Sequence, residues 1–362
     1  MRHGAQRFLT YLVRGLSDLG YTQRVIVLNK AFDADIEEAL SSAGCSITYI
    51  GKFMFLLAGA GWWRLVAILK RSKPDAVMTM LDFADTLGRP AARLAGCPAL
   101  LSSIQVRNLT KPSWRRWLDR KTVRWADKVV FNTNEIVNYA RETEGVLEHQ
   151  VVVIPNGVDD LLARSGAQRT SYRKELGIEP ETVLIGTLGR LYRQKNLPLL
   201  LRSAAKLSAA RPWTILVVGD GPERARLVAL ARELGLTQRL IWLGSREDVG
   251  GWLAAMDVFV HTADFEGMPN AVMEAMAMGL AVVASNVDGN RELIRNGVSG
   301  YLVPPGDVSG FAEQIQHLVD NPNWARQIGE EAHRQILERF STARMIHAYN
   351  QLFTELAHPE SP

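Results

Sequence analysis

Cysteine is almost absent from this chain of 362 residues. Cys45 and Cys97 are the only two, and neither lies in a Cys-x-x-Cys pair or in a cluster of cysteine and histidine. Such usage excludes a disulfide framework and a zinc site with the common ligand spacing. A reducing compartment, the cytoplasm, is therefore the expected location.

Long apolar runs are lacking as well. The N-terminus, Met1–Phe8, has no apolar core of the kind that a secretory signal contains. The longest candidate for a membrane span, residues 53–69, is interrupted by Arg64, and a spanning helix needs roughly 20 apolar residues. We expect neither a cleaved leader nor a transmembrane helix.

Internal repeats and low-complexity segments are missing too, and 47% hydrophobic with 22% charged residues is ordinary for a folded enzyme. The charge is uneven along the chain. Residues 1–170 hold 23 Lys and Arg against 16 Asp and Glu, a balance of +7, and the remainder has a balance of −3. The basic half favours an anionic partner or surface.

Short β-branched runs alternate with amphipathic stretches in two successive series, which predicts two doubly wound α/β domains with parallel sheets. We place the domains at residues 1–165 and 166–339, because the polar stretch after Pro155–Asp159 suits a connection. A terminal segment, residues 340–362, contains a predicted amphipathic helix. Its apolar positions recur on one helical face; they are Met345, Ile346, Tyr349, Leu352 and Phe353.

The start of the chain departs from a doubly wound domain, whose first strand normally lies at the centre of the sheet. Here a helix is expected at Phe8–Leu19 with no strand before it. The first strand is therefore expected to be absent. Either translation begins upstream of Met1, or the sheet tolerates an unusual edge.

Three cations precede a predicted helix that begins at Leu199, after the expected strand at residues 183–187. They are Arg190, Arg193 and Lys195. The positive end of a helix dipole disfavours such a cluster unless an anion lies among the cations. A diphosphate fits this arrangement. A solvated basic loop is the open alternative.

A second turn, Gly219–Glu223, follows the strand expected at residues 214–218. Glycine at such a turn often serves only to let a helix close on a strand. The structural explanation is favoured over direct ligand contact for Gly219 and Gly221.

The segment from Val258 to Met276 has two carboxylates separated by seven residues, Glu266 and Glu274, at the start of a helix. Carboxylates accept hydrogen bonds from vicinal hydroxyl groups, and helix N-terminal amides bind phosphate or sugar oxygens. The segment thus fits a sugar or ribose ligand. The alternative is that Glu266 complements the helix dipole and Glu274 lies on the surface.

Together these segments closely resemble glycosyltransferase family 4, retaining enzymes of the GT-B fold. The resemblance implies two Rossmann-like domains that face a cleft, with the C-terminal helix returning to the N-terminal domain. It implies that Arg190 and Lys195 hold the donor diphosphate, that Glu266 binds the donor-sugar hydroxyls and that Glu274 binds the ribose. The remaining expected donor-binding residues are Gly4, Gly267, Met268, Pro269, Asn270 and Ala271.

The resemblance also implies a reaction. A sugar would pass from a UDP- or GDP-linked donor to a glycan or lipid-linked acceptor, in the synthesis of cell-surface polysaccharide or glycolipid. As the bond to phosphate breaks, Arg190 and Lys195 would stabilise the growing charge of the leaving group. No cofactor and no metal are expected, and Asp33-Ala34-Asp35 is interpreted as a helix cap.

The N-terminal half departs from the family pattern. Many members have a histidine after the strand that corresponds to Ala99–Ile104, whereas this chain continues with Gln105, Val106 and Arg107. Arg107 is a candidate for binding a phosphate of the acceptor or the donor. The alternative is a structural residue of the loop. The acceptor is therefore not specified.

A basic aromatic segment spans residues 111–125, with a shorter one at residues 62–64. Tryptophan beside Lys or Arg suits a membrane interface, so peripheral docking on anionic lipid is one interpretation. The other is a helix with buried Trp and a solvated basic face. No nucleic-acid motif accompanies the segment.

Two other functions remain open: a nucleotide-sugar-binding protein that has lost transfer, and a sugar epimerase of similar architecture. The joint presence of Arg190, Lys195, Glu266 and Glu274 favours transfer over both.

Overall fold

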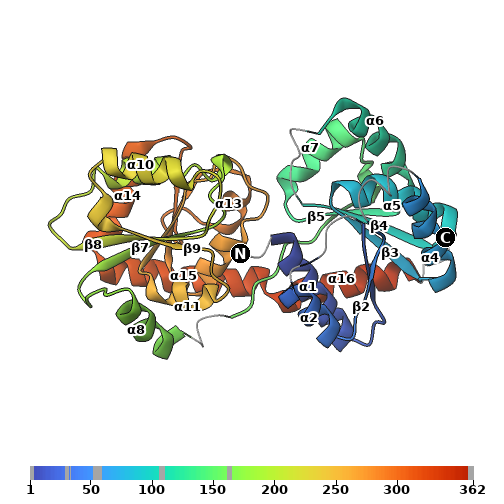
Figure 1. The fold of residues 1–362 in the computed structure, drawn as a ribbon, viewed down its shortest axis with the longest axis horizontal. Coiled ribbons are helices and arrows are strands. Elements are labelled where there is room, and N and C mark those ends of the chain that lie inside the picture. The colour runs from blue at the N-terminus through green and yellow to red at the C-terminus, as the bar shows by residue number, and fades with distance from the viewer. Residues whose placement is uncertain are drawn as a thin grey trace. The chain divides into compact units, whose positions relative to one another are not determined.

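The computed structural model describes residues 4–28, 32, 34–51, 59–105, 111–160 and 165–357. The chain forms two compact units (Figure 1). The N-terminal unit comprises Gly4–Gly157 and Thr342–Pro362, and the C-terminal unit contains Val158–Ser341. Arg107, Asp33 and the segment at residues 106–110 lie outside the described residues.

Within the described residues the chain crosses between the units at residues 157–158 and 341–342. The two crossings run side by side, because the amide of Val158 donates to the carbonyl of Phe340 at 2.9 Å. A Cβ atom on Gly157 would lie 2.5 Å from the Cα atom of Thr342, so the approach requires glycine. The sequence placed the boundary near residue 165, but Ser165 begins a helix that packs within the C-terminal unit.

All strands of the N-terminal unit are parallel, and they form a two-stranded and a four-stranded sheet, β1-β2 and β3-β4-β5-β6. The strands are β1 (Arg24–Val27), β2 (Ser46–Tyr49), β3 (Ala76–Met80), β4 (Ala99–Ile104), β5 (Lys128–Phe131) and β6 (Val151–Val153). Within the described residues the first element is helix α1 (Gly4–Asp18). Gly4 is its first residue.

The other helical elements of this unit are α2 (Ala34–Ser42), α4 (Ala60–Ser72), α5 (Asp82–Ala95), α6 (Ser113–Thr122), η1 (Val123–Trp125), α7 (Asn134–Glu144), η2 (Glu148–Gln150) and α16 (Thr342–Ala357). The terminal helix α16 buries the predicted apolar face against α1, where Tyr349 contacts Phe8 with ring centroids 5.9 Å apart. The return of the C-terminal helix to this unit is confirmed.

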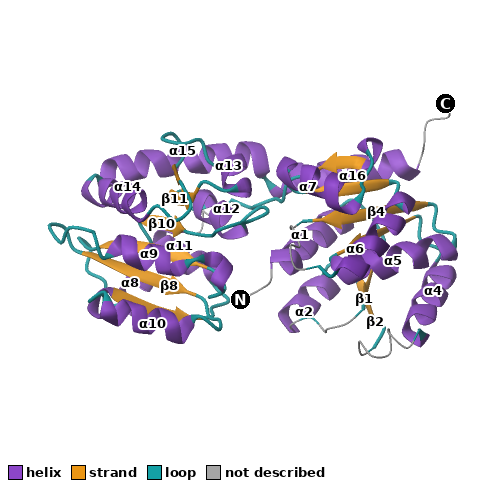
Figure 2. Ribbon diagram, turned by 90° about the horizontal axis from the view of Figure 1, so that it is seen from above, coloured by secondary structure: helices purple, strands orange, loops and turns teal. Residues whose placement is uncertain are grey.

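The C-terminal unit contains one six-stranded parallel sheet of order β12-β11-β10-β7-β8-β9. Figure 2 labels its strands β8, β10 and β11. The strands are β7 (Val183–Leu188), β8 (Trp213–Val218), β9 (Leu240–Gly244), β10 (Val258–His261), β11 (Ala281–Ser285) and β12 (Tyr301–Val303). Helices cover both faces of a parallel sheet, so its central strands are buried on both sides. Strands β7, β10 and β11 are accordingly buried at every residue, which explains their continuous apolar runs in the sequence.

Two groups of helices cover this sheet. The elements are α8 (Ser165–Glu175), η4 (Arg193–Lys195), α9 (Leu197–Ala204), α10 (Arg224–Glu233), η5 (Thr237–Arg239), α11 (Val249–Ala255), α12 (Asn270–Ala277), α13 (Asp288–Leu293), α14 (Val308–Asp320) and α15 (Pro322–Phe340). Helices α9, α10 and α14 share one apolar cluster, and α11, α12 and α15 share another. No helix of the described ranges is long and apolar enough to cross a membrane.

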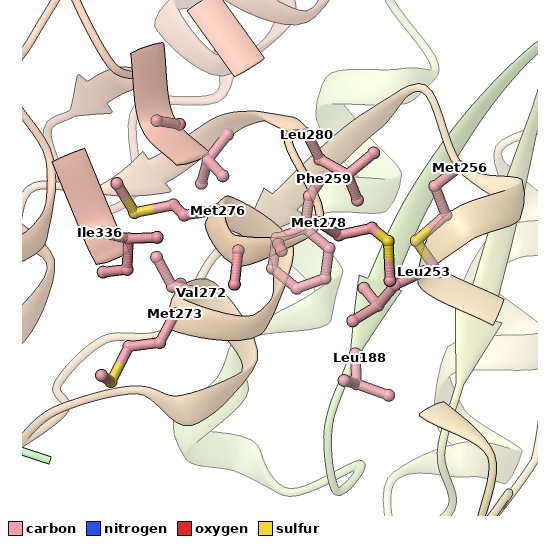
Figure 3. Packing of buried hydrophobic residues seen from close by; sticks show 14 of the residues in the cluster. Leu188, Leu253, Met256, Phe259, Val272, Met273, Met276, Met278, Leu280 and Ile336 are labelled. Atoms are coloured by element: carbon pink, nitrogen blue, oxygen red, sulfur yellow. The ribbon is translucent and has the colours of Figure 1, made fainter. Parts of the chain in front are cut away.

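Helix α12 is held firmly in the second cluster. Its Val272, Met273 and Met276 pack among Phe259 of β10 and Ile336 of α15 (Figure 3). A helix that is buried on this scale cannot shift without opening the core. The residues at its N-terminus are therefore held on a rigid support.

The winding of the C-terminal sheet reverses at β7. From β7 the chain proceeds through β8 to β9 on one side, and then through β10 to β12 on the other side. The helices after β7 and β10, α9 and α12, belong to the two different apolar clusters. Loops that leave neighbouring strands toward opposite faces open a crevice at the carboxyl ends of those strands, where doubly wound sheets bind ligands.

Candidate active site

A pocket lies at this reversal point, at the carboxyl ends of β7, β8 and β10. Its lining includes Leu188, Gly189, Lys195, Val218 and His261. The pocket therefore contains one of the three cations that the sequence singled out.

The loop after β7 is hydrogen-bonded to the turn after β8. The amide of Leu191 donates to the carbonyl of Asp220 at 2.9 Å. A Cβ atom on Gly221 would lie 2.5 Å from the carbonyl oxygen of Leu191. Gly221 thus permits the close approach of two loop backbones, a structural role that differs from the packing of a helix on its strand that the sequence predicted.

The loops after β7 and β10 are joined to each other. Four hydrogen bonds make the connection: the Asp264 amide to the Gln194 carbonyl at 2.9 Å, Gln194 Nε2 to the Phe265 carbonyl at 2.8 Å, Asn196 Nδ2 to Asp264 Oδ1 at 2.7 Å, and Thr262 Oγ1 to the Lys195 carbonyl at 3.0 Å. Asn196 has a left-handed backbone, with φ of 44°, which asparagine tolerates better than most residues. The joined loops fix Lys195 opposite Glu266.

Lys195 and Glu266 form an ion pair between Nζ and Oε1. Their side chains are 19% and 12% exposed, so both are largely shielded from solvent, and Lys195 also lines the pocket. Burial on its own would raise the pKa of the Glu266 carboxyl, but the Lys195 ammonium and the His261 ring oppose it and lower the pKa to about 2. Glu266 is a carboxylate at neutral pH, and not only a complement to the helix dipole.

His261, the last residue of β10, is buried beside this pair. Its Nε2 atom lies 3.5 Å from Glu266 Oε1, and its Nδ1 atom lies 3.3 Å from Asn290 Nδ2. Burial lowers the pKa of the ring, and the contact with Glu266 only partly opposes this effect. The ring is therefore neutral near pH 7.

The tautomer of His261 follows from its neighbours. The Asn290 amide donates to the Ser285 carbonyl at 2.8 Å with one hydrogen, so its second hydrogen is directed to His261 Nδ1. The ring proton then lies on Nε2, the nitrogen that is 3.5 Å from Glu266 Oε1. The sequence reasoning missed His261 and Asn290, although a histidine at the carboxyl end of a buried strand was a usable signal.

The turn after Glu266 contains the expected donor-binding residues Gly267, Met268 and Pro269, and α12 begins with Asn270 and Ala271. The N-terminal turn of a helix presents amide groups and a positive dipole end. The turn is backed by α13, since a Cβ atom on Gly289 would lie 1.6 Å from the carbonyl oxygen of Gly267.

Glu274 lies on α12, about one turn after the helix start, and is 5% exposed. Its burial excludes the alternative of a surface residue. Arg190 is exposed, and its guanidinium lies 4.8 Å from the centroid of the Tyr192 ring. The structure thus brings Lys195 and Glu266 into contact. Arg190 lies on the exposed side of the loop after β7 and does not take part in this pair.

The geometry supports two chemical capabilities. A cation and a carboxylate at the edge of a crevice can exchange their mutual contact for an anionic group and for hydroxyl groups of a ligand. Lys195 has Glu266 as its counter-ion, and its expected contact with a diphosphate stays a prediction. Among the described residues no group of three or more His, Cys, Asp or Glu could hold a metal ion.

Comparison with family models identifies two segments. Residues 2–160 match the model described as Glycosyltransferase Family 4, and residues 182–321 match Glycosyl transferases group 1. Together the two segments cover most of the chain.

Two curated relatives illustrate the similarity in sequence. The lipopolysaccharide core biosynthesis glycosyltransferase LpsE of Rhizobium meliloti is 27% identical over 350 residues, which cover 96% of this chain and 95% of the relative. The UDP-Gal:alpha-D-GlcNAc-diphosphoundecaprenol alpha-1,3-galactosyltransferase of Escherichia coli is 28% identical over 304 residues, which cover 81% and 78% of the two chains.

Solved structures are similar in fold. The Anabaena protein HepE, in complex with UDP and glucose, superposes with a TM-score of 0.82 at 23% identity and covers 98% of this chain and 96% of its own. WaaG, described as a glycosyltransferase involved in lipopolysaccharide biosynthesis, superposes with a TM-score of 0.74 at 16% identity over 97% and 96% of the two chains. The two-domain GT-B architecture that the sequence predicts is thereby confirmed.

Proposed function

This chain belongs to the family 4 glycosyltransferases, and from that premise we propose that it transfers a sugar from a nucleotide-diphosphate donor with retention at the anomeric carbon. The observation that carries the proposal is the ion pair of Lys195 and Glu266, held in the crevice by the joined loops after β7 and β10. The pair brings together the side chain proposed to bind the diphosphate, Lys195, and the side chain proposed to bind the sugar, Glu266.

The proposed roles follow from charge and position. Lys195 and Arg190 stabilise the diphosphate as the bond from the anomeric carbon to phosphate breaks, because negative charge grows on the leaving oxygen in the transition state. Glu266 accepts hydrogen bonds from donor-sugar hydroxyls. The amides from Gly267 to Ala271 contact sugar and phosphate oxygens, and Glu274 binds the ribose. In this assignment the protein needs no metal and no cofactor.

We propose a UDP- or GDP-linked donor. The HepE crystals contain UDP or UDP-glucose, and the E. coli relative is named for a UDP-Gal donor. Those ligands belong to the relatives, and they make UDP-sugars the first donors to test.

We propose a glycan or lipid-linked acceptor in the synthesis of cell-surface polysaccharide or glycolipid. The names of the relatives support this class: one acts in lipopolysaccharide core biosynthesis, and the other is named for a diphosphoundecaprenol acceptor. A lipid-linked acceptor is embedded in a membrane. We therefore propose that the protein associates peripherally with the cytoplasmic face of that membrane. Gly4 and Arg107 stay candidates for contacts from the N-terminal unit.

A panel of UDP- and GDP-sugars tests the donor, first by thermal shift and then by incubation with a lipid extract. Transfer to an extract component, with the product linkage in the same anomeric configuration as the donor, supports the proposal. Donor binding without transfer to any acceptor would indicate a binding protein, and conversion of one nucleotide sugar into another would indicate an epimerase. Inversion of configuration would contradict the retaining assignment.

A further inference from the structure

Lys195 and Glu266 are bound to each other, and they are also the side chains proposed to bind the two ends of the donor. The Lys195 stem lies against Gly189 at the carboxyl end of β7, where an added Cβ atom would be 3.7 Å from Lys195 Cε. Glu266 lies in the loop between β10 and α12. A diphosphate that binds Lys195 therefore meets a cation that a carboxylate already engages.

The two loops are held together, so they do not relieve this competition by moving apart. Gln194 Nε2 donates to the Phe265 carbonyl at 2.8 Å. Thr262 Oγ1 donates to the Lys195 carbonyl at 3.0 Å. These bonds flank both members of the ion pair. Lys195 and Glu266 therefore separate through rotation of their own side chains, while the main chain keeps them within reach of each other.

Among the residues that the structure describes, Lys195 is the only permanent cation paired with Glu266. The other partner of the carboxylate is His261, whose Nε2 atom lies 3.5 Å from Oε1. Burial lowers the pKa of this ring, so the ring is neutral near pH 7. A shielded carboxylate without a counter-ion is destabilised. Separation of the pair is therefore unfavourable unless another group donates to Glu266.

A nucleotide sugar and the nucleoside diphosphate that remains after transfer differ in this respect. In the proposed roles, the sugar hydroxyls of the donor donate to Glu266 while the diphosphate binds Lys195, so both charges stay compensated. The product has no sugar hydroxyl to donate there. Its terminal phosphate is no longer esterified by the sugar and carries more negative charge, which the nearby carboxylate repels. The carboxylate therefore opposes the product more strongly than the donor.

We propose that the Lys195–Glu266 pair discriminates the nucleotide-sugar donor from the nucleoside-diphosphate product and thereby promotes product release. Glu266 competes with the diphosphate for Lys195, a role that is separate from its binding of sugar hydroxyls. Once the acceptor holds the sugar, Glu266 regains Lys195 and the diphosphate is released. The inference rests on the proposed function, because it takes the diphosphate and the sugar as ligands of these two side chains.

Arg190 differs from Lys195 in a way that makes the proposal testable. It is the other cation proposed for the diphosphate, but its guanidinium is exposed and lies 4.8 Å from the centroid of the Tyr192 ring. Within the described residues no carboxylate forms an ion pair with it. A diphosphate therefore binds Arg190 without displacing a carboxylate. Loss of Arg190 should weaken donor and product binding alike, whereas loss of the Glu266 charge should move the two affinities in opposite directions.

Calorimetric titration of the full chain with UDP and with UDP-glucose tests the inference, and GDP with GDP-mannose is the second ligand pair. Glu266→Gln has nearly the same size and no charge. It should bind the diphosphate about tenfold more tightly than wild type and the nucleotide sugar about tenfold more weakly. The dissociation rate of the diphosphate, measured by stopped flow, should fall in the same variant. Glu313→Gln removes an exposed carboxylate from α14 and should change neither affinity.

Three further variants separate competition from a structural role. Glu266→Ala removes the same charge, so it should also bind the diphosphate more tightly and gives a second measurement if Glu266→Gln folds poorly. Glu266→Asp retains the charge and should not gain affinity for the diphosphate. Arg190→Gln should weaken both ligands by a similar factor. A purely structural role of Glu266 predicts weaker binding of both ligands, and a folding defect does not imitate a gain in affinity.

Lys195→Ala distinguishes failure of this inference from failure of the proposed function. If this variant loses affinity for the diphosphate while Glu266→Gln and Glu266→Ala gain none, Lys195 binds the diphosphate and the competition is refuted. If Lys195→Ala binds both ligands like wild type, or the wild-type chain binds neither ligand pair, the proposed function fails and the inference fails with it. An equal gain in Glu313→Gln would indicate a general effect of charge and would also overturn the inference.

Discussion

Nε2 of His261 lies 3.5 Å from Oε1 of Glu266, with Asn290 directed at the opposite nitrogen of the ring. A neutral imidazole held in this way fixes the direction of the carboxylate without competing for its charge. We therefore assign His261 as a positioning residue for Glu266, because its ring faces the carboxylate.

We expect His261→Leu to lower kcat about tenfold, because the Glu266 carboxylate loses the polar ring 3.5 Å away and gains an apolar neighbour. His261→Gln, which retains an N–H donor, should recover part of the activity. His317→Gln, at an exposed position, is the matched control. Steady-state kinetics across pH check the result, and wild-type values for His261→Leu would show that the contact is incidental.

Loss of the cation at the centre of the site should be more severe. Lys195→Ala should reduce kcat by roughly 100-fold or more, which is typical of removing one group that stabilises a developing anion. Glu266→Ala should cause a similar loss, because the same ion pair is broken. Lys206→Ala, an exposed lysine of the same unit, serves as control. Activity of both site variants near the wild-type level would refute the assignment.

Glu274 should act on binding more than on turnover. Its carboxylate is buried on α12, one turn beyond the residues that address the sugar. Glu274→Gln should therefore weaken binding of UDP or GDP about tenfold, with a smaller change in kcat. Calorimetric titration with the nucleotide separates the two effects. A reduced kcat with unchanged nucleotide affinity would place Glu274 elsewhere in the mechanism.

Stability should depend on pH through Glu266. Its pKa in the folded chain, about 2, lies below the ordinary value of 4.5 for a glutamate side chain. A lowered pKa contributes stability that is fully present above the unfolded value and is lost as pH falls toward the folded value, at most about 3 kcal/mol here. The free energies of unfolding of wild type and Glu266→Gln should therefore differ by a constant amount above about pH 5 and converge as the pH falls toward 2. The same difference near pH 2 as above about pH 5 would contradict the shift.

The contact of α13 with the turn at residues 267–269 can be tested at Gly289. A Cβ atom there would lie 1.6 Å from the Gly267 carbonyl oxygen, so Gly289→Ala should displace the turn, lower the free energy of unfolding by about 1–3 kcal/mol and raise the donor KM. The control is Gly250→Ala on α11, where a Cβ atom would meet only Asp248 Oδ1 at 3.8 Å. If both variants have the same free energy of unfolding and the same donor KM, the turn accommodates the added methyl group without loss.

Much of the fold could be predicted because its signals are local. The β-branched runs of β7 and β10 and the apolar face of α16 appear in the sequence as patterns of period and composition. The crossing at residues 157–158 could not be placed in this way. It depends on the close contact of Gly157 with Thr342, almost two hundred positions away.

The candidate site divides along the same line. Arg190, Lys195, Glu266 and Glu274 were identified from the sequence, because cations before one helix and carboxylates around the start of another are visible as short motifs. The support from His261 and Asn290 was not, since nothing in either neighbourhood reveals that a buried ring will meet an amide 29 residues later.

The sequence by itself determined the two α/β halves and the nucleotide-sugar motifs of the second, because hydrophobic period and helix-start chemistry act over a few residues. Tertiary structure decided which groups meet and which face outward. Lys195 pairs with Glu266 across 71 positions because β7 and β10 are neighbours in the sheet. Helix α6 exposes its tryptophans because Lys111 and Glu144 hold Asp119 inside, and the rotation of a helix is set by its partners.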